Sequence, residues 1–202
     1  MIEQAVADAR ERLVWRARRE GLATLGYDVL DSPLGPLWVA VGPAGVAALH
    51  YGDEPTASDL ARLVRAHGPG LVPDPHRASG LARELEEYFA GKRRAFAVAA
   101  DLSGLTPFQR RILGATARVP YGELTTYATV ARRAGNERAS RAAGGALGAN
   151  PIAIVVPCHR VVASDGSLGG YAGGLPAKRR LLALERAGEV PQGGWQPSRM
   201  RG

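Results

Sequence analysis

The 202-residue sequence contains one cysteine, Cys158, which excludes an internal disulfide framework and any zinc motif built from several cysteines. The four histidines, at positions 50, 67, 76 and 159, form no pair with the spacing of metal ligands, so we expect no metal site. No apolar run reaches the roughly 18 residues of a membrane span, and the charged N-terminus lacks a signal-peptide core. These absences predict a cytoplasmic protein without membrane association, whose thiol stays reduced.

Lysine is almost missing as well: only Lys92 and Lys178 occur, and the other 24 basic residues are arginines. The net charge of +7 is unevenly placed. Residues 1–100 hold 12 basic and 13 acidic residues, whereas residues 101–202 hold 14 and 6. A basic half favours a polyanionic partner such as nucleic acid. A solvated, arginine-rich surface explains the charge equally well, so charge alone leaves both interpretations open.

The N-terminal half predicts a helix followed by a small sheet. Residues 1–21 form a charged amphipathic pattern, with Val6, Leu13, Val14 and Ala17 on its apolar side. Residues 24–52 are interrupted by "DSPLGP" and "GPAG", which predicts three short antiparallel strands. Helical patterns follow over 57–67 and 81–90, and "AFAVAADLSG" (95–104) predicts a strand and a linker.

The C-terminal half predicts several helices around a buried strand. A capping box of Thr106 and Gln109 begins one helix, which ends before Pro120. Helices over 125–133 and 138–148, joined by a turn with Gly135, predict a helix-turn-helix, although most such pairs bind no DNA. "IAIVV" (152–156) predicts a buried strand, and a last helix runs from Pro176 to Gly188. The tail beyond Val190 is expected to be loose.

The predicted helix over 138–148 contains two interior glycines, Gly144 and Gly145, each costing about 1 kcal/mol relative to alanine. Its other side chains are nearly all small, apart from Arg138, Arg141 and Leu147. Such a helix can pack tightly against another helix, or it can approach a nucleic-acid groove. The first interpretation is favoured on the sequence pattern alone.

The single thiol lies in "IVVPCHRVV", where His159 and Arg160 follow Cys158 at once. A neighbouring histidine and positive charge favour the reactive thiolate, although a lone cysteine is more often an inert buried residue. A carboxylate that orients the histidine would complete a catalytic set. Glu185 shares a helical face with Leu181 and Leu182, so it can point inward to a buried partner, or it can pair at the surface with Arg180 or Arg186.

Three segments together resemble one family. "PYGELTTYATVARRAG", "RAAGGALGANP" and "NPIAIVVPCHRVVASDGSLGGYAGG" occur in the order found in the O6-alkylguanine-DNA alkyltransferases, whose reactive-site signature is Pro-Cys-His-Arg. The resemblance implies an α/β (α+β) fold, with a ribonuclease-H-like three-stranded antiparallel sheet before a winged helix-turn-helix-like domain. We therefore expect a helical extension (1–22), an N-terminal domain (23–101), an alkyltransferase domain (102–188) and a flexible tail (189–202).

The resemblance also implies single-turnover DNA repair, in which Cys158 irreversibly accepts the alkyl group of O6-alkylguanine, without a cofactor or an obligate protein partner. His159 would act as base through a water molecule, oriented by Glu185, and Asn150 would hold the reactive turn. Tyr127 would donate to the leaving base. The pocket would be lined by Tyr127, Tyr171 and the backbone of Val161 and Ala172.

The expected partner is double-stranded alkylated DNA, with the damaged base flipped out of the stack. Arg141 matches the residue that takes the place of the flipped base, and Asn136, Ser164 and Arg160 are further expected DNA contacts. The main alternative is a non-catalytic alkyltransferase-like protein that only binds lesions, but such proteins lack the cysteine. A Cys-His hydrolase and a helix-turn-helix regulator are weaker alternatives.

Overall fold

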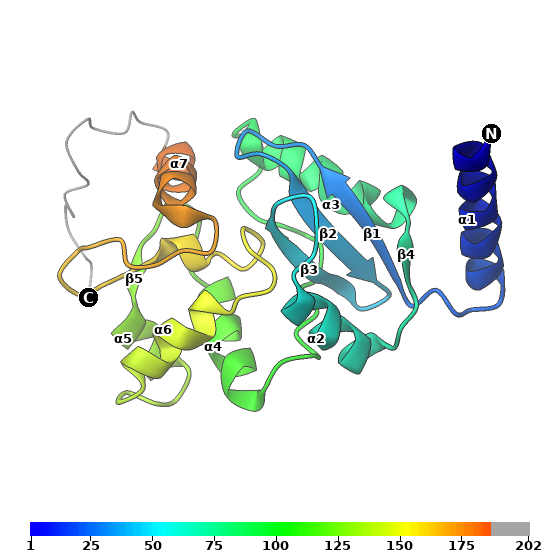
Figure 1. Cartoon of the computed structure of the whole chain (residues 1–202). Helices are drawn as coiled ribbons and strands as arrows, with labels where there is room; N and C mark the ends of the chain where they lie inside the picture. The colour runs from blue at the N-terminus through cyan, green and yellow to red at the C-terminus, as the bar shows by residue number, and fades with distance from the viewer. Residues whose placement is uncertain (187–202) are drawn as a thin grey trace.

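The structure, a computed structural model, describes residues 1–186. The expected tail over 189–202 and the last residues of the predicted final helix lie outside the described residues. Figure 1 shows a sheet with two helices in the N-terminal half and a cluster of helices in the C-terminal half.

The predicted strands form an antiparallel meander of β1 (Leu25–Leu30), β2 (Leu37–Gly42) and β3 (Gly45–Tyr51). The sheet has a fourth strand that the sequence did not predict, because β4 (Leu71–Pro73) pairs in parallel with β1 and gives the order β3-β2-β1-β4. β4 is only three residues long and ends in proline, which is tolerated at a sheet edge. It therefore carries no alternation from which a strand could be predicted.

Each face of the sheet packs against one helix. Leu37 and Val39 of β2 belong to the core that includes α3 (Pro75–Phe89), while Trp38 and Ala40 pack on the other face with Leu63 of α2 (Ala57–His67). Successive residues of a strand point to opposite faces, so this alternation follows from the pleat. The α3 side shares its core with the C-terminal helices, and the two halves are therefore joined by apolar packing.

The free edge of β3 binds the segment that leads to Cys158. The backbone N–H of Leu49 donates to the carbonyl of Pro151 at 2.8 Å, and Ala153 N–H donates to Leu49 O at 2.9 Å. The expected strand over 152–156 is wrong: only Ile152 forms a bridge, and the chain then turns through Ile154, whose φ is 68°. An apolar β-branched run signals burial, but burial alone does not distinguish a strand from a buried turn.

The segment over 95–104 also contains no regular strand. Its contact with the sheet is a single bridge between Ala100 and Val46 of β3, so the expected strand there is wrong and the segment is a linker. The buried Glu84 of α3 accepts hydrogen bonds from the backbone N–H groups of Ala97 and Val98. A side chain thus satisfies donors that a regular strand would pair with a neighbouring strand.

The C-terminal half begins with α4 (Pro107–Ala117), which carries the predicted capping box of Thr106 and Gln109. The helix-turn-helix consists of α5 (Tyr127–Arg133) and α6 (Ser140–Gly148). The short strands β5 (Thr125–Thr126) and β6 (Val161–Val162) pair in parallel, with the one-turn helix η1 (Cys158–Arg160) directly before β6. The helix α7 (Gly174–Arg186) closes the described chain and begins two residues before the predicted start.

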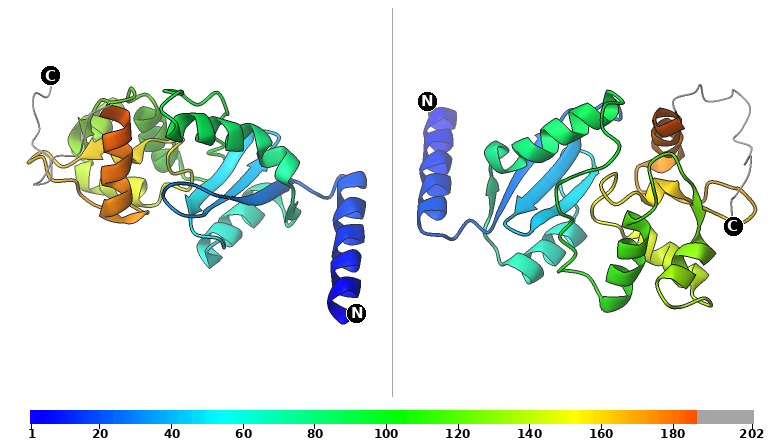
Figure 2. Two further views of the ribbon diagram at one scale, coloured as in Figure 1. Left: turned by 90° about the horizontal axis from the view of Figure 1, so that it is seen from above. Right: turned by 180° about the vertical axis from the view of Figure 1, so that it is seen from behind.

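The N-terminal helix α1 (Ile2–Arg19) stands apart from the rest of the molecule in all views (Figures 1 and 2). The helix is as predicted, but its apolar side is not covered, since Val6 and Leu13 are exposed. Arg18 ties the end of α1 to the sheet by donating to the carbonyl of Pro73 at 2.6 Å. Within the described residues, no helix is both long and apolar enough to cross a membrane.

Candidate active site around Cys158

Cys158 lies in a buried turn that Asn150 holds in place. The Asn150 Nδ2 group donates to the Cys158 sulfur at 3.1 Å and to the Val156 carbonyl at 2.9 Å, while its Oδ1 accepts from the Ile152 backbone N–H at 3.0 Å. Asn150 follows α6 and is itself buried. One amide side chain therefore fixes both the reactive sulfur and the turn around Ile154.

The neighbour of Cys158, His159, is bonded to Glu185. The His159 Nε2 donates to Glu185 Oε1 at 2.8 Å, and both side chains are fully enclosed. The inward orientation of Glu185 is thus the one observed, and the alternative of a surface pair with Arg180 or Arg186 is wrong. The helical face shared with Leu181 and Leu182 places the carboxylate inside, because both leucines are core residues.

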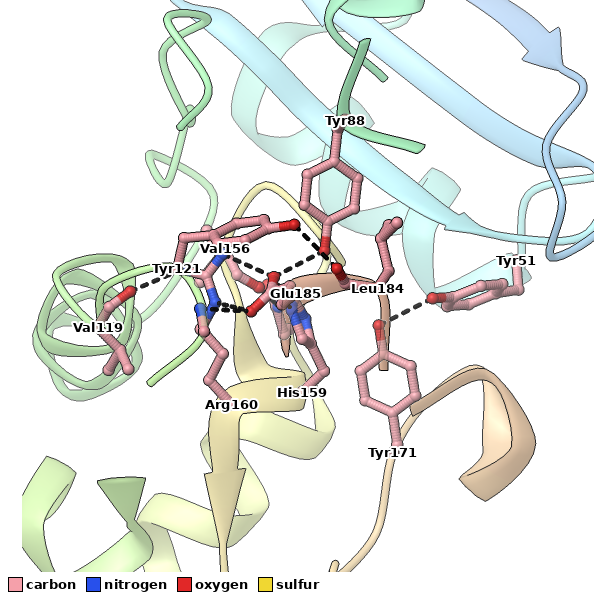
Figure 3. Close-up of polar contacts among 12 residues, drawn as sticks. Tyr51, Tyr88, Val119, Tyr121, Val156, His159, Arg160, Tyr171, Leu184 and Glu185 are labelled. Atoms are coloured by element: carbon pink, nitrogen blue, oxygen red, sulfur yellow. Dashed lines mark hydrogen bonds and ion pairs between the residues drawn. The ribbon is translucent and has the colours of Figure 1, made fainter. Parts of the chain in front are cut away.

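Glu185 accepts five hydrogen bonds in all (Figure 3). Besides His159, Oε1 accepts from Arg160 at 2.8 Å and from the Tyr88 hydroxyl at 2.7 Å. Its other oxygen, Oε2, accepts from the Arg160 Nε at 2.9 Å and from the Gly122 backbone N–H at 3.1 Å. Burial would raise the pKa of Glu185, but the hydrogen bonds and charges of His159 and Arg160 outweigh it and lower the pKa to about 2.

The expectation that Arg160 contacts DNA is corrected by its position. Arg160 is buried, and its guanidinium is occupied by Glu185 and by the carbonyl of Val119, to which it donates at 2.6 Å. A buried carboxylate needs a paired charge, and the forked guanidinium supplies one with bidentate geometry. Arg160 therefore neutralises Glu185 inside the protein.

Burial sets the resting protonation of the two reactive groups. It raises the pKa of Cys158, against the opposing effects of the Asn150 hydrogen bond and the charge of Lys178. Burial also lowers the pKa of His159, against the opposing effect of Glu185. The pair therefore rests as a neutral thiol beside a neutral imidazole that can accept its proton.

Cys158 opens onto a cavity of about 410 Å³, within the range of roughly 300–1,000 Å³ that is typical of small-molecule sites. The helix-turn-helix forms one wall and the loop before α7 forms the other; the lining residues are Tyr127, Gly144, Leu147, Gly148, Cys158, Gly170, Tyr171 and Ala172. Three predicted pocket residues, Tyr127, Tyr171 and Ala172, are among them. Val161 is not among the described residues that line this cavity, because it is buried in β6.

The loop that carries Tyr171 is held by close contacts. The Tyr171 hydroxyl lies 2.8 Å from the hydroxyl of Tyr51, which is at the end of β3. Figure 3 shows the two side chains pointing toward one another. At Gly173 a Cβ would lie 2.4 Å from the Tyr51 ring, and at Gly169, where φ is 64°, a Cβ would lie 2.5 Å from the Tyr127 hydroxyl. Glycines are thus required where the loop passes these two tyrosines.

Lys178 is a residue of the site that the sequence analysis missed. It is fully buried on α7, and its Nζ donates to the Val161 carbonyl at 2.7 Å and to the Leu168 carbonyl. Burial lowers the pKa of Lys178 to about 8, against the opposing effect of Cys158. The signal was present in the sequence, because Lys178 is one of two lysines and lies one helical turn before the buried Leu181 and Leu182.

The remaining DNA contacts expected from the sequence are at the surface. Arg141 is exposed in the first turn of α6, Asn136 is exposed in the loop before it, and Ser164 is exposed after β6. A Cβ at Gly145 would meet nothing within 4 Å, and a Cβ at Gly144 would meet only the Tyr127 ring at 3.8 Å. The helix α6 does pack on its neighbours through buried Ala143 and Ala146, as the favoured interpretation expected, but this packing does not require the two glycines.

Residues 1–186 contain no group of three or more His, Cys, Asp or Glu side chains arranged to hold a metal ion. The acidic and imidazole groups at the centre of the site bond to one another and to Arg160 instead. The arrangement is that of a thiol nucleophile with an oriented base, beside a cavity of ligand size.

Comparison with known proteins matches two consecutive regions of the chain to one family. Residues 25–102 match the "6-O-methylguanine DNA methyltransferase, ribonuclease-like domain", and residues 107–187 match the "6-O-methylguanine DNA methyltransferase, DNA binding domain". The methylated-DNA–protein-cysteine methyltransferase of Mycobacterium tuberculosis is 42% identical over 164 residues, which cover 80% of this chain and 92% of the relative. The protein of the same name from Methanosarcina barkeri is 40% identical over 160 residues, covering 79% and 96%.

Among solved structures, the crystal structure of Mycobacterium tuberculosis OGT in complex with DNA superimposes with a TM-score of 0.69 at 41% identity, covering 80% of this chain and 93% of that one. The fold expected from the sequence is thereby confirmed, with the fourth strand as an addition. The matched regions together span most of the chain, and the chain therefore belongs to the 6-O-methylguanine DNA methyltransferase family.

Proposed function

We propose that this protein repairs DNA by transferring the alkyl group of O6-alkylguanine to Cys158 in one irreversible step. A bond forms between the Cys158 sulfur and the alkyl carbon, while the bond between that carbon and guanine O6 breaks. The observation that carries this proposal is the joint position of Cys158, which faces a ligand-sized cavity, and of His159, which is bonded to a buried, ionised Glu185. The family membership supports the same reaction.

The thiol proton goes to His159 in this proposal. Among the described residues, His159 Nδ1 is buried and makes no hydrogen bond, while Nε2 is engaged with Glu185. The nitrogen left to receive the proton is therefore Nδ1, through a bridging water molecule. Glu185 stabilises the imidazolium that results, as the third member of a catalytic triad does.

The cavity residues would bind the damaged base. We propose that the Tyr127 hydroxyl donates a hydrogen bond to the base as it leaves, since Tyr127 lines the same cavity as Cys158. The released guanine then gains one proton, which balances the thiol proton that His159 received. Tyr171 and the backbone of Ala172 would line the base, and Asn150 would hold the sulfur in line for attack. We also propose that the backbone of Val161 lies beside the base, with its carbonyl held by Lys178.

The DNA would reach the cavity along α6. Gly144, Leu147 and Gly148 of this helix line the cavity, and Arg141 lies exposed in its first turn. We propose that α6 enters the minor groove, that Arg141 occupies the place of the flipped base, and that Asn136 and Ser164 bind nearby. Small residues on a helix permit such an approach, and flipping exposes the alkyl carbon.

We also propose the division expected from the sequence, with a helical extension over 1–22, domains over 23–101 and 102–188, and a tail over 189–202. We also propose that repair needs no obligate protein partner. A reduced thiol is the reactant, which supports a cytoplasmic location.

The test is the stoichiometry of transfer from an oligonucleotide duplex with a single O6-methylguanine. We expect the intact protein mass to rise by one methyl group at Cys158 and the guanine to be restored, with one turnover per protein. Cys158→Ser should gain no mass. Several turnovers per protein would overturn the proposal, and binding of the lesion by the unmodified protein without transfer would favour a lesion-binding protein.

A further inference from the structure

The catalytic carboxylate receives a hydrogen bond from the ribonuclease-like half of the molecule. Tyr88 lies on α3, is fully buried, and donates from its hydroxyl to Glu185 Oε1 at 2.7 Å. Figure 3 shows its ring pointing from α3 toward Glu185, on the side opposite His159 and Arg160. The acceptor is the oxygen that His159 Nε2 also uses.

We propose that Tyr88 is a positioning residue for alkyl transfer, which fixes Glu185 and reduces the pull of its carboxylate on the His159 proton. The inference rests on the proposed function. A carboxylate has about four lone-pair sites, and Glu185 has five donors, three of them on Oε1. Donors on the same oxygen compete for its charge. Without the Tyr88 hydroxyl, His159 would receive a larger share and would hold a proton more strongly.

The buried environment of Tyr88 suits this task. Burial, followed by the negative charge of Glu185, raises the pKa of Tyr88, so its hydroxyl stays protonated and remains a donor throughout the working pH range. The ring is fixed by aromatic contacts with Phe89, Phe96 and Tyr121. A rigid, neutral donor adjusts the carboxylate without adding a charge to the site.

Other groups around His159 set the background for this effect. Among the described residues, the charged or titratable side chains that face the His159–Glu185 pair are Cys158 and Arg160 from its own segment, Tyr121 before β5, Lys178 from α7, Tyr171 from the loop and Tyr88 from α3. Arg160 and Lys178 both oppose protonation of His159. Lys178 bonds to backbone carbonyls, whereas Arg160 shares Glu185 Oε1 with Tyr88; both keep their positive charge when the Tyr88 hydroxyl is removed.

The experiment compares Tyr88→Phe with Tyr121→Phe. The Tyr121 hydroxyl donates to the backbone carbonyl of Leu184 at 3.2 Å, one residue before Glu185, and makes no hydrogen bond to the carboxylate. Each variant loses one hydroxyl from the same aromatic cluster. The measurement is the single-turnover rate of methyl transfer at saturating O6-methylguanine duplex, as a function of pH.

Transfer requires neutral His159, so the rate falls on the acidic side as His159 becomes protonated. We expect Tyr88→Phe to move this acidic limb upward by about one pH unit, which equals a tenfold change in proton affinity. Tyr121→Phe should leave the limb in place. In a Glu185→Gln background, Tyr88→Phe should cause no further movement, because the charge that it modulates is gone.

The proposal is overturned if the acidic limb of the pH–rate profile stays in place in Tyr88→Phe. It is also overturned if this limb moves equally in Tyr88→Phe and Tyr121→Phe. If Tyr88→Phe does not fold, incorporation of 3-fluorotyrosine at position 88 keeps the ring and makes the hydroxyl a stronger donor, and the limb should then move downward. Absence of methyl transfer by the wild-type protein would instead refute the proposed function itself.

Discussion

Glu185 is almost fully buried, yet its hydrogen bonds keep it ionised. The sequence allowed its inward orientation, because leucines close in the chain define the face of α7, but it left a surface pair with Arg180 or Arg186 open. Its partners could not be predicted, since Tyr88 is 97 residues away and Arg160 was expected to face DNA. Contacts of this separation depend on how the two halves pack, which no local pattern encodes.

At the residue scale, we expect Glu185→Gln to slow alkyl transfer while keeping DNA affinity. The amide cannot stabilise the imidazolium, and general-base contributions run to roughly 100- to 10,000-fold. The measurement is the single-turnover rate, with DNA affinity determined separately. The matched control is Glu123→Gln, an exposed carboxylate next to Gly122. An unchanged rate in Glu185→Gln would show that the carboxylate has only a structural role.

At the scale of elements, the helices of the C-terminal half were predictable because their signals are local. The capping box before α4 and the glycine-containing turn between α5 and α6 both occur where the sequence indicated. The buried turn over 152–156 was not predictable, since Ile154 adopts a positive φ that a β-branched residue rarely accepts. The Asn150 hydrogen bonds and the pairing with Leu49 impose this conformation from outside the segment.

Gly145, an exposed glycine inside α6, gives a prediction for this helix. Gly145→Ala should stabilise the protein by up to about 1 kcal/mol, because the added methyl group meets no atom within 4 Å and alanine favours the helix. If α6 enters the groove, the same methyl group should weaken repair of duplex DNA. The measurements are the free energy of unfolding and the repair rate. A variant that is more stable and repairs duplex DNA normally would show that this face does not approach DNA closely.

Arg141 provides the second prediction for α6. If its side chain fills the gap left by a flipped base, Arg141→Ala should slow repair strongly in a fully paired duplex, because unstacking costs a few kcal/mol. The loss should be much smaller for a lesion in a mismatch and for free O6-benzylguanine, which needs no flipping. The second-order rate constants on these three substrates, compared with wild type, provide the measurement.

Arg138→Ala is the matched control, since it removes an exposed arginine just before α6. A contact with phosphate alone would weaken repair of both duplexes equally and reduce the salt dependence by about one ion. An equal loss on the free base would indicate damage to the pocket.

At the scale of the whole molecule, the site joins the two halves of the chain. β3 pairs with the segment before Cys158, Tyr51 contacts the loop of Tyr171, and Tyr88 reaches Glu185. The composition and charge indicated a basic C-terminal half, but they could not indicate that the N-terminal half contacts the residues around Cys158. That information lies in the packing of α3 and β3 against the C-terminal core.

This arrangement predicts how stability depends on acid. The pKa of Glu185 is about 2 in the folded protein, compared with an ordinary value of 4.5. A lowered pKa contributes stability that is present above about pH 4.5 and is lost as the pH falls toward 2. The difference corresponds to about 3 kcal/mol. Urea unfolding at several pH values should therefore show Glu185→Gln destabilised at neutral pH by at least this amount, because Arg160 is also left without its partner.

The difference in the free energy of unfolding between wild type and Glu185→Gln should shrink by about 3 kcal/mol as the pH falls from 4.5 to 2. Protonation removes from the wild-type Glu185 the charge that the variant already lacks. Glu123→Gln should follow the wild-type curve throughout. Because Glu185 bonds to groups from both halves, the loss of stability on acidification should appear in one transition that involves the whole described fold. A difference that stays constant with pH would mean that Glu185 does not titrate differently in the folded and unfolded states.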